Sequence, residues 1–176
     1  MINQQTILQN DMIGEPITSP VASDALKTLY LESLSLVERL HRRLLDVVKD
    51  EFERQGRSDL NAVQALLLFN IGDGELTAGE LKSRGYYQGS NVSYNLKKLV
   101  DLGFVSHRRS SVDRRTVRVA LTPAGKEIAE IVGGLYDRHI GSIEKVGGLS
   151  ADEFGQLNKA MQRLDRFWND QILYRL

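Results

Sequence analysis

Basic side chains are concentrated in one part of a chain that is neutral as a whole. Its 176 residues include 23 Lys and Arg and 23 Asp and Glu. Residues 82–118 nevertheless contain nine Lys or Arg and only two Asp, which gives this segment a net charge of +7. A basic block of this kind favours binding of a polyanion at one surface. A solvated charged face would have the same composition, so charge alone leaves both readings open.

Residues 90–102, inside the basic block, have the pattern of an amphipathic helix. At about 100° per residue, Val92, Leu96 and Leu99 fall on one face and are expected to pack on a core. The rest of the helix carries hydroxyl, amide, phenol and ammonium groups, which can bond to base edges or phosphates of DNA. The contacts that we expect are to major-groove bases from Ser90, Asn91, Ser93 and Tyr94, and to phosphates from Lys97 and Lys98. An ordinary surface helix would show the same pattern.

Two strands and a charged loop follow this helix. Residues 104–108 and 116–121 predict a β-hairpin, because apolar side chains alternate from Val117 to Leu121. A narrow minor groove attracts an inserted arginine, and a neighbouring aspartate can hold the guanidinium in a fixed geometry. The hairpin residues expected to contact DNA are Arg108, Arg109, Asp113, Arg114 and Arg115. The alternative is a solvated basic turn.

Capping and glycine signals predict the helices that position these groups. We expect a long helix over residues 23–55, a buried helix over 62–71 capped by Asp59, and a short helix that starts at a capping box of Thr77 and Glu80. Thr122 begins another helix, which later glycines could kink or end early, and residues 150–175 form the last. Two short helices and a hairpin indicate a winged helix-turn-helix. The predicted fold class is mainly α with a small two- to three-stranded β wing.

The elements predict three regions of the chain. Residues 57–122 would be a winged helix-turn-helix DNA-binding domain, residues 23–56 and 123–176 a helical dimerisation region, and residues 1–22 a polar N-terminal arm. In the last helix a heptad-like seam favours a homodimer. The seam consists of Leu157, Met161, Leu164 and Trp168. The alternative for this seam is a bundle within one chain.

Two spaced motifs support this organisation. One is Asp113-x-Arg115 followed by Leu121-Thr122-x-x-Gly125, and the other is Thr77-x-x-Glu80-Leu81 followed by residues 92–105. Together they resemble the signature of the MarR family of winged-helix transcription regulators. The resemblance covers about residues 23–175, and within the family the chain is similar to the branch that regulates cell-wall L,D-transpeptidase genes.

The resemblance implies a homodimer that binds a pseudo-palindromic operator in double-stranded DNA. It also implies that a small, often aromatic, effector changes the DNA affinity. Candidate ligand contacts lie where the first, second and fifth helices are expected to meet: Tyr30, Leu34, His41, Arg42 and Phe69. A buried tyrosine or histidine is more often a core residue than a ligand contact, so that alternative stays open.

Other classes of function have little support in the sequence. There is no Cys for a disulfide, a zinc thiolate site or a thiol switch, and the three His lack the spacing of a metal site. No paired carboxylates or phosphate-binding loop indicate an enzyme or a cofactor. Without a membrane span or signal peptide, we expect a cytoplasmic protein that does not bind membranes. The competing hypothesis is a winged helix that docks a protein and does not bind DNA.

Overall fold

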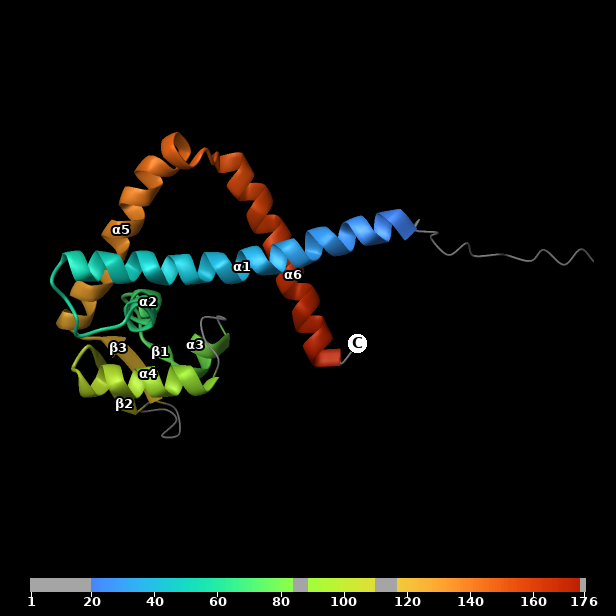
Figure 1. Cartoon of the computed structure of the whole chain (residues 1–176). Coiled ribbons are helices and arrows are strands. Elements are labelled where there is room, and N and C mark those ends of the chain that lie inside the picture. The colour runs from blue at the N-terminus through green and yellow to red at the C-terminus, as the bar shows by residue number, and fades with distance from the viewer. Residues whose placement is uncertain (1–19, 84–88, 110–116, 175–176) are drawn as a thin grey trace, which may run out of the picture. The chain divides into compact units, whose positions relative to one another are not determined.

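The computed structural model describes residues 20–83, 89–109 and 117–174 of the chain. Figure 1 shows that these ranges are mainly helical. The helices are α1 Pro20–Arg54, α2 Ala62–Ile71, α3 Ala78–Ser83, α4 Gly89–Asp101, α5 Pro123–Gly147 and α6 Ala151–Tyr174. Strands β1 Leu76–Thr77, β2 Val105–Arg109 and β3 Val117–Leu121 form one antiparallel sheet in the order β1-β3-β2. The predicted fold class is confirmed, with three strands in the wing.

Residues 20–44 and Leu45–Leu176 belong to two separate compact units. The second unit contains the last turns of α1, all the other helices and the sheet. None of the helices in the described ranges combines the length and the apolar character that a membrane span requires.

Helix α2 is the centre of the core in the second unit. It is apolar on nearly all sides, and Leu67 and Leu68 are completely buried. Its N-cap is Asn61, whose side chain accepts the N–H of Gln64 at 2.9 Å, while the Gln64 side chain accepts the N–H of Asn61 at 3.2 Å. The predicted cap, Asp59, is therefore wrong. Asp59 lies three residues before the first helical residue, too early to reach its N–H groups, and it pairs instead with Arg57 at 2.9 Å.

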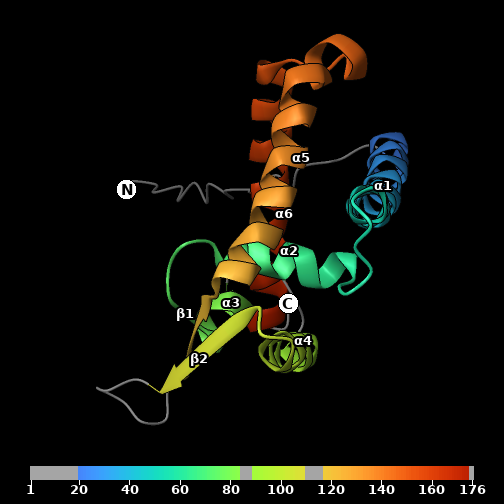
Figure 2. The same cartoon turned by 90° about the vertical axis from the view of Figure 1, so that its left-hand side faces the viewer.

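The wing is held by strand register and by a short capped helix. The N–H of Glu80 donates to the hydroxyl of Thr77 at 3.0 Å, and the N–H of Thr77 donates to the Glu80 carboxylate at 2.6 Å. The predicted capping box is thus confirmed at the start of α3. On β3, Val119 is buried and Arg118 is exposed, as the alternation predicted. Figure 2 shows α4 beside β2, one of the two edge strands of this sheet.

The start of α5 packs closely against the corner between α4 and β2. Gly103 turns the chain at this corner with a positive φ of 78°, a conformation that glycine adopts without steric cost. Thr122 caps α5 by accepting the N–H of Gly125 at 3.2 Å, and its hydroxyl donates to the carbonyl of Gly103 at 2.7 Å. A side chain at position 125 would overlap the carbonyl oxygen of Phe104. Only glycine therefore fits position 125 without a shift of the backbone.

Helix α5 continues through the glycines that could have ended it early. Ile128, Val132 and Leu135 are buried at steps of four and three residues. Their packing outweighs the poor helix propensity of Gly133 and Gly134. The helix ends at Gly147, and the next residue, Gly148, is its C-cap with a positive φ of 67°.

An ion pair connects the last turns of α1 with α5. Arg138 Nη2 lies 2.7 Å from Oε1 of Glu51, a residue that is 6% exposed. Gln55 donates to the same oxygen at 2.8 Å. These hydrogen bonds, from Gln55 and then Arg138, lower the pKa of Glu51 below its usual value. The carboxylate therefore stays charged despite its burial and ties the two helices together within the second unit.

The close approach at Gly125 leads to a test of the fold. Gly125→Ala should lower the free energy of unfolding by about 1–3 kcal/mol, because the added methyl group forces a shift in a packed junction. Gly141→Ala is the matched control, since it lies in the same helix and its added Cβ meets no atom within 4 Å. Helix propensity predicts a gain of about 0.5–1 kcal/mol for that control. Urea unfolding measures both changes, and equal midpoints for wild type and Gly125→Ala would contradict the close approach.

Candidate nucleic-acid interface

Helix α4 carries the predicted recognition face on a buried base. Val92 and Leu99 are completely buried and Leu96 is 7% exposed, so the predicted inward face is confirmed. The described side chains on the opposite face and its flank are exposed: Ser93, Tyr94, Lys97, Lys98 and, in the last turn, the acidic Asp101. The first four present hydroxyl, phenol and ammonium groups, which can bond to bases and phosphates.

The other predicted DNA contacts lie at the ends of elements or outside the described residues. Ser90 and Asn91 belong to the first turn of α4, and Arg108 and Arg109 are the last two residues of β2. Residues 113–115, which include Asp113, Arg114 and Arg115, lie outside the described ranges. Contact of any of these residues with DNA stays a prediction.

Arg118 is an exposed basic residue that the site prediction did not include. It lies on the central strand β3, and its Cα partner on β2 is Arg108. The exposed guanidinium of Arg118 adds a positive charge to the hairpin, which supports the argument from the basic block. The alternation of β3 indicated an outward Arg118, but a single sequence does not give its cross-strand partner.

A buried hydrogen bond joins α4 to α2. Nε2 of Gln64, which is 1% exposed, donates to Oδ1 of Asn95 at 3.3 Å. The sequence pattern placed Asn95 on a flank of the recognition face, but it is 9% exposed and lies against α2. The polar contact between the two helices was therefore not predicted.

The predicted ligand contacts are divided between the two units. Tyr30, Leu34, His41 and Arg42 belong to the unit with residues 20–44, and Phe69 belongs to the other. Phe69 is half-buried and packs edge-on against Tyr136, with ring centroids 5.2 Å apart and planes at 89°. A shared site for the five residues stays a prediction. Among the described residues no group of His, Asp and Glu could hold a metal ion.

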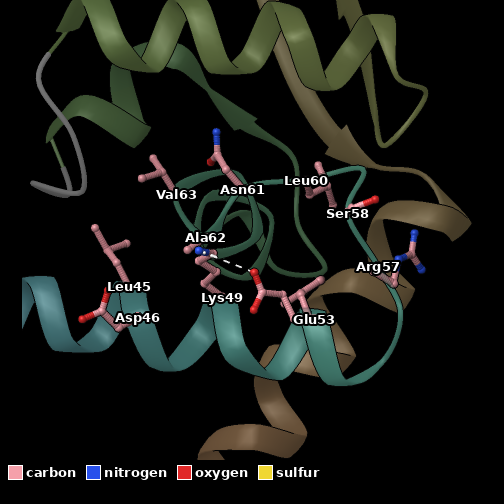
Figure 3. Close-up of a pocket in the computed structure, with 11 residues that line it drawn as sticks. Leu45, Asp46, Lys49, Glu53, Arg57, Ser58, Leu60, Asn61, Ala62 and Val63 are labelled. Atoms are coloured by element: carbon pink, nitrogen blue, oxygen red, sulfur yellow. Dashed lines mark ion pairs between the residues drawn. The ribbon is translucent and has the colours of Figure 1, made fainter.

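A pocket of about 410 Å³ lies between the last turns of α1 and the start of α2 (Figure 3). Apolar side chains such as Leu45 and Leu60 line it together with charged ones, and Lys49 pairs with Glu53 at 3.5 Å. Asn61, the N-cap of α2, is also part of the lining. None of the five predicted ligand residues lines this pocket. The sequence did not indicate it, because its walls come from two helices and the segment between them, which meet only in the folded chain.

Comparison with known proteins identifies the domain. Residues 58–116 match the model of the MarR family. The exopolysaccharide II synthesis transcriptional activator ExpG of Rhizobium meliloti (strain 1021) is 35% identical over 120 residues, which cover 68% of this chain and 61% of that protein. The chain thus spans less than two thirds of that relative.

Solved structures with the same fold include two whose descriptions mention DNA binding. A variant of MarR from E. coli complexed with operator DNA has a TM-score of 0.60 and 24% identity, over 74% of this chain and 91% of that one. A structure that concerns regulation of DNA binding of Bordetella bronchiseptica BpsR by 6-hydroxynicotinic acid has a TM-score of 0.60 and 20% identity, with the same coverage of 74% and 91%. At these identities the likeness establishes the winged-helix fold.

The two faces of α4 can be separated by neighbouring substitutions. Val92→Ala removes completely buried methyl groups and should cost about 2 kcal/mol of stability. Tyr94→Ala removes a side chain that is 67% exposed and should change stability by less than about 0.5 kcal/mol. Thermal unfolding of both variants measures the difference. An equally large loss for Tyr94→Ala would mean that the phenol is required for folding and is not free to contact a partner.

Proposed function

Residues 58–116 of this chain are a MarR family domain, and on this premise we propose that the protein is a homodimeric transcription regulator that binds a specific sequence in double-stranded DNA. The observation that carries the proposal is the exposed face of α4. Tyr94, Lys97 and Lys98 are exposed on a helix whose other face is anchored by the buried Val92 and Leu99. The major groove admits a helix of this size, and its polar face then meets the base edges.

The relatives support a role in transcription. ExpG is named a transcriptional activator, and the variant of MarR was crystallised with operator DNA. The proposed DNA contacts have two roles. Bases are read by Ser90, Asn91, Ser93 and Tyr94, and phosphates are held by Lys97, Lys98, Arg108 and Arg109. Residues 113–115, which lie between β2 and β3 in the sequence, would enter the minor groove.

We propose that residues 23–56 and 123–176 form the dimer interface, as the sequence predicted. The DNA-binding domain of residues 57–122 and the arm of residues 1–22 are the other two proposed regions. Large apolar side chains are exposed in both parts of the dimer region, for example Leu26 at 69% and Ile172 at 75%. Monomeric proteins rarely leave extended apolar surface uncovered. A two-fold dimer presents two recognition helices to half-sites about one helical turn, or a multiple of it, apart, which matches a pseudo-palindromic operator.

The proposed effector is a small aromatic molecule that changes the DNA affinity. BpsR supports this part, because its DNA binding is described as regulated by 6-hydroxynicotinic acid, an aromatic acid. The proposed contacts are Tyr30, Leu34, His41, Arg42 and Phe69. The aromatic rings would stack on such a ligand, and the guanidinium of Arg42 would pair with its carboxylate.

Salt dependence tests DNA binding directly. Each neutralised phosphate should contribute about −0.9 to the slope of log K against log salt. Lys98→Ala should therefore make the slope less negative by about 1. Lys145→Ala removes the same charge from the last turn of α5 and should leave the slope unchanged. Fluorescence anisotropy with a labelled duplex gives the slopes. A wild-type slope near zero would exclude DNA binding and favour the alternative, a winged helix that docks an acidic protein.

Sedimentation tests the dimer. Wild-type protein should sediment at about twice the 19.8 kDa mass of the chain. Leu157→Glu should shift it toward the monomer, because Leu157 lies on the heptad-like seam and is 46% exposed in the single chain. Lys159→Glu, at an exposed position of the same helix, is the control and should leave the mass unchanged. A wild-type monomer at micromolar concentration would support the alternative of a bundle within one chain.

A further inference from the structure

The hydrogen bond between Gln64 and Asn95 joins the central helix of the core to the helix that presents the recognition face. We propose that these two side chains are positioning residues for DNA recognition, because their buried hydrogen bond sets the rotation of α4 about its own axis. The inference rests on the proposed function of α4 and adds a specificity-determining pair that does not itself touch DNA.

The bond is directional, and a second hydrogen bond fixes its Gln64 end. Gln64 is 1% exposed, and its Nε2 donates to Asn95 Oδ1 at 3.3 Å. Its Oε1 accepts the N–H of Asn61 at 3.2 Å. Since the capping box occupies the oxygen, the amide nitrogen of Gln64 is the group that faces α4. Rotation of this amide by 180° would break both bonds, so α2 presents a donor of fixed position to Asn95.

The apolar contacts of α4 do not supply the same constraint. Val92, Leu96 and Leu99 bury one face of the helix, and burial of apolar surface is non-directional. Their packing therefore tolerates a small rotation of α4 more easily than a hydrogen bond does. A buried polar pair penalises such a rotation, because its donor and acceptor would be separated out of reach of water.

A rotation of α4 acts directly on the recognition face. Asn95 is adjacent to Tyr94 in the sequence and three residues before Lys98. Tyrosine and lysine side chains are longer than that of asparagine, so a rotation that breaks the Gln64–Asn95 bond displaces the ends of Tyr94 and Lys98 by a larger distance. Contacts to base edges depend on close geometry, whereas attraction to phosphates depends mainly on charge. Loss of the bond should therefore reduce sequence specificity more than general DNA affinity.

The experiment compares specific and non-specific binding of the full-length chain. The first probe is a duplex that the wild-type protein selects from a random-sequence library, and the second is a scrambled duplex of the same length and composition. Gln64→Met and Asn95→Leu each replace one amide by an apolar group of similar size. Each should lower affinity for the selected duplex about tenfold and leave affinity for the scrambled duplex and the salt slope unchanged. Gln64→Met also removes the acceptor of the Asn61 N–H, which Asn95→Leu leaves in place, so Asn95→Leu is the cleaner of the two variants. The double variant should be no weaker than the weaker single variant, because both changes remove the bond between Gln64 and Asn95.

Val92→Ala is the matched control for general loosening of α4. It loosens the same helix without removing either amide, so it should lower the unfolding temperature and leave the ratio of specific to non-specific affinity unchanged. An equal drop of the ratio in Val92→Ala would overturn the positioning role, as would an unchanged ratio in Gln64→Met and Asn95→Leu. If both amide variants fail to fold, the bond serves folding and the proposal is also wrong. Failure of the wild-type chain to select any duplex would instead refute the proposed function, and this inference with it.

Discussion

The geometry of the candidate interface depends on one side-chain hydroxyl. Thr122 donates to the carbonyl of Gly103 at 2.7 Å and accepts the N–H of Gly125 at 3.2 Å. Helix α4 ends just before Gly103, β3 ends one residue before Thr122, and α5 begins one residue after it. The recognition helix, the hairpin and the long helix are therefore joined at a single point. Any displacement of the start of α5 acts on both parts of the interface together.

Features that depend on local chemistry were predictable from the sequence. The spacing of Val92, Leu96 and Leu99 gave the inward face of α4, and this face is buried. A hydroxyl three residues before a glutamate predicted the cap of α3 at Thr77. The same pattern is present at the start of α6, where the N–H of Glu153 donates to Ser150 at 3.3 Å. In each case the bonded groups lie within one helical turn, so the pattern contains all the partners.

Features that depend on a distant partner were not predictable. The cap of α2 is an exception, because Asn61 and Gln64 bond within one helical turn. The sequence therefore contained both partners of this capping box, and the choice of Asp59 overlooked them. A helical wheel placed Asn95 on a flank but could not tell which flank α2 covers, and Gln64 lies 31 residues earlier in the chain. Similarly, the opposition of Arg118 and Arg108 follows from strand register. These contacts arise only when the elements pack together.

The junction at Thr122 is made largely by main-chain groups. The carbonyls of Gly103 and Phe104 and the N–H groups of Thr122 and Gly125 take part, and the sequence must supply only one hydroxyl and one residue without a Cβ. Substitutions elsewhere on these elements leave those groups available. The surface residues can therefore change widely while the hydrogen bonds of the junction are kept. Distant homologues should therefore share this threonine–glycine pair more often than the side chains on the outer face of α4, which are free to change with the operator.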